Sequence, residues 1–443
     1  MTPFKQRLHS ALAWVDASRP PNVKPAGWRA FQLGLVFMPT SALLAGLGLL
    51  ASLTLWRPVN EPRPLSRPMA RWLLLLATWL AVTMLAGGGS LEVKLRLANW
   101  LPFFWLLLAA VPYLATVPSR ERLGLLVLVA TVPALLVGLL QALLLLSGPW
   151  TALGGLLNWD LPARYAAEGA GVFPNPNFTA AWYTMALPIA AAHGLQRSQW
   201  PAWGLLALLS TGVVLSGSRT ALVGSTVGVL LLAWRRFWKP VLLLAALQTA
   251  LVTLALLLPS DHGIGPLAQR LSGGLASKLA PMLRGAGSTA AEAIASGRDP
   301  YRSELFPQAI QFIQHHPLLG LAEPLLGQPP VEPPALLTHT HNVAFQLSIQ
   351  HGLPAALLLV GLVLWLLLRG WQARPQGIDR ALLSSAVAAV WLHAYDIPSF
   401  DSRNNMLGWL LLSCCWAVGG GAAGASTPPD PDEAQNGPGW GDA

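Results

Sequence analysis

Apolar residues follow one another in long runs along most of this chain. A run such as "LGLLVLVATVPALLVGLLQALLLL" carries no charge, and as a helix of about 20 residues or more it crosses the roughly 30 Å hydrocarbon core of a bilayer. A helix satisfies its own backbone hydrogen bonds in lipid, so these runs predict membrane-spanning helices. Eleven runs recur, at 30–56, 70–86, 100–117, 122–147, 178–194, 202–216, 220–234, 239–259, 352–369, 380–396 and 405–419.

The first run is broken in its middle by "FMPTSALLAGLG". Pro39 lacks a backbone donor and disfavours helical geometry in the residue before it, which predicts a break. If 30–56 is a hairpin of two short helices, the cytoplasmic segments hold 18 of the 28 Lys and Arg, and 10 lie outside. That distribution follows the positive-inside rule, whereas a single crossing would place the basic segment 57–71 outside.

The predicted fold is therefore all-α, a polytopic transmembrane helical bundle of about 12 spans with both termini in the cytoplasm. Residues 1–29 form the cytoplasmic N-terminal segment, and 30–259 hold the first nine helices. A large extracytoplasmic loop, 260–351, contains "RSELFPQAIQFIQHHPLLG", whose helical spacing predicts helices along the membrane face. Three more helices occupy 352–419, and the acidic tail 420–443 has the composition of a disordered cytoplasmic end.

Composition supports a membrane protein and argues against nucleic-acid binding. Charged residues make up 11% of the chain, well below the roughly 25% of soluble domains. The net charge is +9, but the basic residues lie in short loops between apolar runs, which is typical of residues that set membrane topology. Cys414 and Cys415 are adjacent within an apolar run, so the sequence predicts no disulfide framework.

Three arginines on the predicted outer side are candidates for binding an anion. Arg219, in "LSGSRTALVG", lies between two apolar runs, and the positive-inside rule does not explain an arginine on that side. A guanidinium matches phosphate geometry with two parallel hydrogen bonds. Arg298 and Arg302 precede the helical stretch of the large loop. Each alone is typical of a solvated charge, but beside Arg219 they would clamp a diphosphate.

The stretch "THTHN" supplies a candidate general base. His341 lies two residues after His339, a spacing that raises the question of a metal site. A metal needs three or four ligands with supporting groups, and no carboxylate lies within eight residues. We therefore expect no metal and no cofactor, and interpret His341 as a neutral imidazole that accepts a proton. The structural alternative is a loop histidine bonded to backbone.

Two other polar positions are open to more than one interpretation. Asn177, directly before the run at 178–194, suits a helix cap, and the alternative is an asparagine that binds sugar. Asp396, Asp401 and Arg403 in "YDIPSFDSRNN" face the outer side. They either contact a polar ligand or pair with one another.

Four stretches together resemble the O-antigen ligase and O-antigen polymerase superfamily over roughly residues 170–415. They are "GVFPNPNFTAA", "SGSRTALVG", "RSELFPQAI…HPLLG" and "HNVAFQLSIQHGLPA", in the family's order and spacing. The ligase motif is His, then Asn, Ser or Gln, nine residues, Gly, and a small residue three further on. Here it reads His341, Asn342, Gly352 and Ala355, where family members usually have Gly, Thr or Val at the last place.

The resemblance implies a glycosyltransferase of the bacterial inner membrane, with its active site on the periplasmic face. The donor would be a glycan on undecaprenyl diphosphate, and the acceptor a hydroxyl of lipid A-core, of another glycan or of a protein. By resemblance His341 is the general base. Asn342, His339, Asn177 and Asp396 are candidates for supporting residues. Arg219 binds the donor diphosphate, and Arg302, which fits the "R…W/F…A" pattern with Phe306 and Ala309, is its second ligand, with Arg298 as fallback.

Two other functions fit the same sequence. A polymerase of the same superfamily would extend the lipid-linked chain, and its motifs are less fixed than the ligase motif. A transporter of bicarbonate or another solute would need no base in the outer loop, and transporters often have paired broken helices in their two halves, whereas here only the first run is broken.

Overall fold

Most of the chain that the structure describes is α-helical. The computed structural model describes residues 12–56, 64–87, 96–152, 156–161, 169–197, 200–233, 246, 248–250, 300–320, 340–396 and 401–424. Its helices are α2 (Pro25–Phe37), α3 (Ala42–Leu50), α4 (Pro68–Ala86), α6 (Leu101–Ala109), α7 (Val117–Leu144), α8 (Pro176–Arg197), α9 (Trp200–Leu215), α10 (Arg219–Ala233), α14 (Pro300–His315), α15 (Val343–Gln372), α16 (Gly377–Tyr395) and α17 (Ser402–Gly424). Short 3-10 or π turns are η1 (Ala51–Leu55), η2 (Pro64–Ser66), η3 (Arg96–Asn99) and η4 (Val111–Leu114).

The one departure from an all-α architecture within the described residues is a small hairpin after α7. Its strands β1 (Gly148–Ala152) and β2 (Leu157–Leu161) pair antiparallel. The indole of Trp159 in β2 donates to the Thr40 carbonyl at 2.7 Å, and the Ser41 hydroxyl donates to the Leu156 carbonyl at 3.0 Å. The sequence analysis did not anticipate these strands, which cover the turn between α2 and α3.

Helices α2 and α3 run antiparallel on either side of Pro39, where the sequence predicts a break. Ser41 caps α3, its hydroxyl accepting from the Leu44 amide at 3.3 Å. Gly34 and Gly48 allow the two backbones to touch, because a Cβ on Gly48 would lie only 2.8 Å from the Gly34 nitrogen. The first apolar run therefore forms two packed antiparallel helices, so the chain enters and leaves this helical hairpin at the same end.

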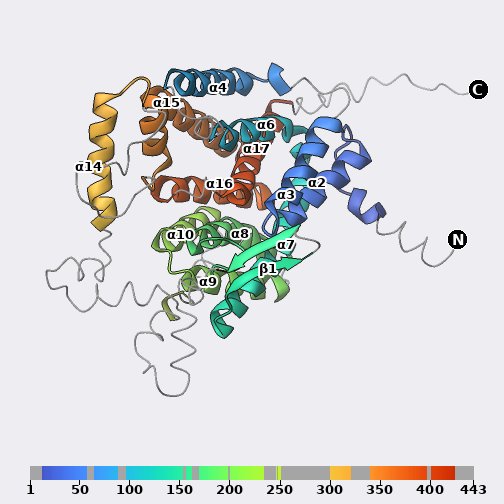
Figure 1. The fold of residues 1–443 in the computed structure, drawn as a ribbon. Coiled ribbons are helices and arrows are strands. Elements are labelled where there is room, and N and C mark those ends of the chain that lie inside the picture. Colours follow the sequence, from blue (N-terminus) through green and yellow to red (C-terminus); the bar gives the residue numbers. More distant parts are fainter. Residues whose placement is uncertain are drawn as a thin grey trace, which may run out of the picture.

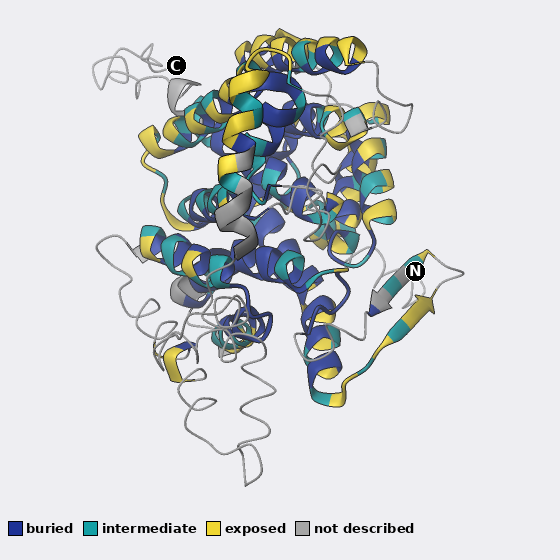
Figure 2. Ribbon diagram, turned by 60° about the vertical axis from the view of Figure 1, so that its left-hand side comes forward, coloured by how far each residue is buried: buried dark blue, intermediate teal, exposed yellow. Residues whose placement is uncertain are grey.

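Apolar side chains cover the outer faces of the helices as well as the core. Three described helices, α4, α7 and α15, are long and apolar enough to cross a membrane, and shorter apolar helices span Ala42–Leu55, Leu97–Ala109, Pro201–Leu215 and Arg219–Leu232. Exposed residues follow these outer surfaces in Figure 2, and large exposed hydrophobic side chains include Leu47, Leu85, Leu140, Leu357 and Leu368. Apolar outer surfaces of this kind are suited to contact with lipid rather than with water. The chain is an integral membrane protein, and the count of twelve spans stays a prediction.

The two ends of the helical body differ. In Figure 1, α8 and α16 lie side by side across the view, and α14 stands upright at one end of them, which we call the α14 end. At the opposite end Arg120, near the start of α7, pairs through two hydrogen bonds of 2.6 and 2.9 Å with Asp379, near the start of α16. The helix that the sequence predicts in the large loop is present as α14.

Helix α15 is two helices joined by a kink. Gly352 has φ 79° and ψ 167°, a backbone geometry open essentially to glycine alone. The predicted boundary between the loop and the next apolar run falls at this kink. Residues 343–351, which the sequence analysis assigned to the loop, form the first helix, and the remainder of α15 forms the second.

Candidate active site

His341 and Asp396 form a pair at the α14 end. Asp396 follows the last residue of α16, and its amide donates to the Leu392 carbonyl at 2.7 Å, which continues the helical turn. The Nδ1 atom of His341 lies 3.2 Å from Oδ1 of Asp396, and the two side chains are 23% and 11% exposed. When Nδ1 donates to the carboxylate, Nε2 is the ring nitrogen that carries the lone pair and accepts a proton. A carboxylate that orients a histidine in this way is typical of general bases.

The backbone of His341 is held in an unusual geometry. Its φ is 52°, in the left-handed region that costs free energy for a residue with a side chain. Thr340, fully buried, fixes the residue before it: its amide donates to Oε1 of Gln346 at 3.0 Å, and its hydroxyl donates to the carbonyl of Asn342 at 2.9 Å. These bonds bridge His341 on both sides, and they hold the strained turn that points the imidazole at Asp396.

Asn342 makes two structural hydrogen bonds, and they explain why the motif has an amide side chain at this position. Its Oδ1 accepts from the Phe345 amide at 2.9 Å, which caps α15, while Nδ2 donates to the Ala394 carbonyl at 2.8 Å, near the end of α16. One side chain therefore fastens the start of α15 to the end of α16. Because Ala394 is two residues before Asp396, this contact also sets the spacing of the His341–Asp396 pair.

Gly352, the glycine of the motif, lies where the backbone of α15 closely approaches the backbone of the turn after α14. A Cβ on Gly352 would overlap the Leu318 carbonyl and lie 3.0 Å from the Leu319 nitrogen. The Leu353 amide donates to the Pro317 carbonyl at 2.8 Å across the same junction. The "HPLLG" turn after α14 therefore packs directly on the kink of α15.

The side chain of His351 belongs to this junction too. Its Nδ1 lies 2.6 Å from the Thr83 hydroxyl of α4, and its carbonyl accepts from the Trp79 indole at 2.8 Å. His351 is buried, so these bonds provide partners for its polar groups away from water.

Helix α14 brings the second predicted arginine to the same end. Phe306 meets Phe345 edge to face at a centroid distance of 5.3 Å, and Ala309, on the same face of α14, is fully buried. Both α14 and the first helix of α15 run toward the junction at Gly352, so their starts lie at the same end. Arg302 is one turn before Phe306 on that face, as His341 is four residues before Phe345. The side chain of Arg302, and all of Arg298 and His339, lie outside the described residues.

Arg219 begins α10 at this end. The turn before it uses Gly217 at φ 66°, and the hydroxyl of Ser218 accepts from the Ala221 amide at 3.3 Å as a helix cap. The carbonyl of Thr220 accepts from the indole of Trp391 in α16 at 3.2 Å. Trp391 is five residues before Asp396, a rise of about 7.5 Å along the helix. The start of α10 therefore lies within about two turns of the His341–Asp396 pair along α16.

The cap that the sequence analysis assigned to Asn177 is made by Asn175. Its Oδ1 accepts from the Asn177 amide at 2.8 Å, and its carbonyl accepts from Phe178 and Thr179. Pro176 takes the first helical position, where a missing amide hydrogen costs nothing. The prediction placed the cap two residues late because it started the helix at the apolar run rather than at the proline. Asn177 lies half-buried in the first turn of α8.

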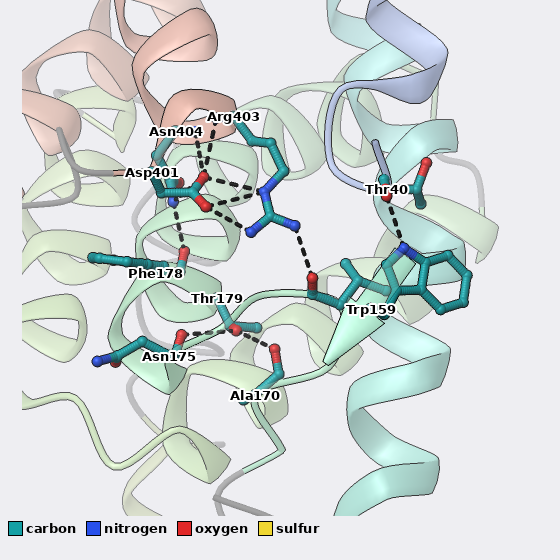
Figure 3. A network of polar contacts seen from close by, with 10 residues as sticks. Thr40, Trp159, Ala170, Asn175, Phe178, Thr179, Asp401, Arg403 and Asn404 are labelled. Atoms are coloured by element: carbon teal, nitrogen blue, oxygen red, sulfur yellow. Dashed lines mark hydrogen bonds and ion pairs between the residues drawn. The ribbon is translucent and has the colours of Figure 1, made fainter. Parts of the chain in front are cut away.

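Asp401 and Arg403 pair with each other, as one of the two interpretations expected. Figure 3 shows the Arg403 guanidinium against the Asp401 carboxylate, with Nη2 donating to Oδ2 at 2.6 Å. Its Nη1 donates to the Val172 carbonyl at 2.7 Å. Asp401 also accepts from the Asn404 amide at 3.0 Å, which caps α17. The Asn404 side chain donates to the Phe178 carbonyl at 3.0 Å. This network joins the start of α17 to the start of α8.

Residues 204–360 match the family model described as O-antigen ligase. This match supports membership of the O-antigen ligase superfamily. The resemblance to the O-antigen ligase and polymerase superfamily is confirmed, and the function in general is of the O-antigen ligase or polymerase type. Comparison with curated proteins gave no match.

The segment that matches the O-antigen ligase model contains most of the candidate site and omits its carboxylate. Arg219, Arg302, His341 and Gly352 all lie within the matched segment, whereas Asp396 lies 36 residues beyond it. Sequence analysis had named Asp396 as a possible ligand contact but had not paired it with His341. Among the described residues, no three His, Cys, Asp or Glu side chains are grouped to hold a metal ion. The expectation of a metal-independent reaction is untested.

An apolar cavity of about 230 Å³ lies beside the O-antigen ligase motif. Helices α15, α16 and α17 line it, with Asn342 and Ala394 at the end nearest His341 and Leu359 and Val363 farther along α15. Its polar lining within the described residues comes from side chains such as Asn342, His393 and Asn405. The cavity therefore has an apolar interior that leads to the polar site.

Proposed function

We propose that this protein is a membrane glycosyltransferase that moves a glycan from undecaprenyl diphosphate to an acceptor hydroxyl, such as one of lipid A-core, on the periplasmic face of the inner membrane. The observation that carries the proposal is the His341–Asp396 pair, which lies 3.2 Å apart at the end of the molecule where Arg219 also begins its helix. The reaction is metal-independent and uses no cofactor.

The proposed chemistry uses His341 as the base and undecaprenyl diphosphate as the leaving group. The acceptor oxygen attacks the anomeric carbon of the donor while its proton passes to Nε2 of His341. The bond between the anomeric carbon and the diphosphate oxygen breaks, and its electron pair leaves with the diphosphate. Attack from the opposite side inverts the configuration at the anomeric carbon. Asp396 accepts from Nδ1 throughout, and stabilises the imidazolium that forms.

Positive charge at the α14 end supports a diphosphate site. Arg219 and Arg302 are assigned to its oxygens, with Arg298 as the alternative second ligand, and bidentate guanidinium contacts neutralise the charge that develops on the leaving group. Helices α8, α10, α15 and α17 also begin at this end. Their helix dipoles add partial positive charge there.

The cavity between α15, α16 and α17 supports a lipid-linked donor. Its lining is almost wholly apolar, and its Asn342 end adjoins the proposed base. Isoprene units of the carrier would occupy this space while the diphosphate stays at the polar end. A free sugar phosphate would gain nothing from such a lining.

The membrane topology that we propose has twelve spans, both termini in the cytoplasm and the active site outside. The Arg120–Asp379 pair places the starts of α7 and α16 at the end opposite His341. The basic segments 57–71 and 369–380 would both lie on that side, as the positive-inside rule requires.

Electrophoresis of surface glycans tests the proposal. A deletion strain would receive the wild-type chain or His341→Ala at matched expression. We expect the variant to leave the glycan pattern unrestored. Polymer that stays on its lipid carrier identifies a ligase, and single repeats identify a polymerase. Full restoration by His341→Ala would favour a transporter, which needs no base in this position.

A further inference from the structure

Next to the proposed base an aromatic pair is held rigidly at the protein surface. Tyr395 is the last residue of α16, immediately before Asp396, and it is 46% exposed. Its ring lies 4.5 Å from the ring of Trp391, centroid to centroid, at an interplanar angle of 40°. The exposed face of the pair therefore adjoins the carboxylate that contacts His341.

The ring of Trp391 is fixed in place. Trp391 is half-buried, and its indole donates to the Thr220 carbonyl at 3.2 Å. Thr220 directly follows Arg219 in the sequence. Trp391 is thereby held between α16 and the start of α10. Tyr395 packs on a ring that is already ordered, so binding against it would cost little further conformational entropy. One ring of the pair is therefore bonded next to Arg219 in the sequence, and the other directly precedes Asp396.

The chemistry of such a surface suits a sugar ring. The face of an aromatic ring carries negative potential, and the C–H groups on one face of a pyranose are weakly positive. A phenol at the edge adds a hydroxyl that donates to or accepts from sugar hydroxyls. Lipid-facing aromatics at a membrane interface are the ordinary alternative, and Trp371, 48% exposed at the end of α15 away from His341, is an example of such a residue.

We propose that Tyr395, packed against Trp391, forms a carbohydrate-binding surface that holds a pyranose ring of one glycan substrate beside His341. The proposal rests on the proposed function and adds a sugar subsite to it. Stacking orients the ring so that either the anomeric carbon of the donor or the acceptor hydroxyl faces Nε2 of His341. Tyr395 makes contact with substrate and takes no part in proton transfer.

Two kinetic variants and one control test the surface. Purified full-length protein in liposomes would transfer glycan from a lipid-linked donor to an acceptor glycolipid, and KM would be measured for each. We expect Tyr395→Ala to raise KM for one of the two substrates roughly five- to tenfold while kcat changes little, as loss of one stacked ring implies. Tyr395→Phe keeps the ring and loses only the hydroxyl, so its KM should rise less than that of Tyr395→Ala. Trp371→Ala should match wild type.

The substrate whose KM rises identifies whether the donor sugar or the acceptor sugar occupies the surface. An unchanged KM for both substrates in Tyr395→Ala would overturn the proposal. So would an equal rise in Trp371→Ala, because that result means membrane anchoring.

Direct binding separates this proposal from the transfer reaction. Lipid-free oligosaccharide should bind wild type more tightly than Tyr395→Ala, while undecaprenyl diphosphate without sugar should bind both equally. Equal binding of the oligosaccharide to both proteins contradicts the sugar surface even if transfer occurs. Failure of transfer in the wild type, with oligosaccharide binding that still depends on Tyr395, contradicts the proposed function and leaves the surface supported.

Discussion

Replacing Gly352 by alanine should separate α14 from the kink of α15. The added methyl group would overlap the Leu318 carbonyl, and neither backbone can yield without moving the "HPLLG" turn. The φ of 79° and ψ of 167° are also costly for alanine, by about 1–3 kcal/mol. If the junction opens, the bond from the Leu353 amide to the Pro317 carbonyl is lost, at about 0.5–1.5 kcal/mol. The two costs together are roughly 1.5–4.5 kcal/mol.

The same substitution would disturb the geometry of the candidate site. Helix α14 carries Arg302, and the first helix of α15 follows His341, so a shift at the junction moves the proposed diphosphate ligand relative to the base. We expect Gly352→Ala to lose most of its glycan transfer and to lower the apparent melting temperature of the purified protein. Thermal unfolding in detergent and restoration of surface glycan in a deletion strain are the assays.

Gly46→Ala is the matched control for this substitution. Gly46 lies within α3, and a Cβ built there meets nothing within 4 Å. This variant should fold and act as the wild type does. Normal transfer and unchanged melting of Gly352→Ala would refute the reasoning, because they would show that the junction tolerates a side chain where the structure has backbone contact.

Three further substitutions test the site from other sides. Asp396→Asn should lower kcat by roughly 10²–10⁴-fold with little change in donor KM, since the imidazole loses the carboxylate that orients it; a wild-type kcat would show that the pair is only structural. Arg219→Lys should lower kcat/KM by at least about tenfold, because an ammonium cannot bind phosphate with two parallel bonds; equal rates with both side chains would remove Arg219 from the diphosphate site. Gln346→Ala leaves the buried Thr340 amide without its partner, at a cost of about 1–3 kcal/mol, and should reduce transfer, with Gln346→Glu recovering part of it. Normal transfer by the alanine variant would mean that other contacts hold the His341 turn.

Local patterns in the sequence predict the larger features of the fold. Long apolar runs indicate helices in a membrane, and Pro39 indicates where the first run turns. The spacing of apolar residues in the large loop predicts α14, since helical periodicity is a property of a short segment. The position of His341 follows from a motif within 15 residues.

Contacts between distant segments are not visible in such patterns. Asp396 is 55 residues from His341, and only the return of α16 to the α14 end brings the two together. The reason for Gly352 lies in a separate element, the turn after α14. Strand β2, "LNWDL", does alternate apolar and polar residues, but a search for long apolar runs passes over so short a pattern, and its partner β1, "GPWTA", has no such alternation. The cap at Asn175 was missed because the apolar run begins later than the helix.

Reconstituted transfer most directly tests the claim that His341 is the base for glycan transfer from a lipid diphosphate. Wild-type protein and His341→Ala, each purified and placed in liposomes with a glycan on undecaprenyl diphosphate and an acceptor glycolipid, would be compared for formation of the joined product. The account predicts that the wild type forms product and releases undecaprenyl diphosphate, and that His341→Ala binds the donor but forms product at least about 10²-fold more slowly. Equal rates for the two proteins would contradict it.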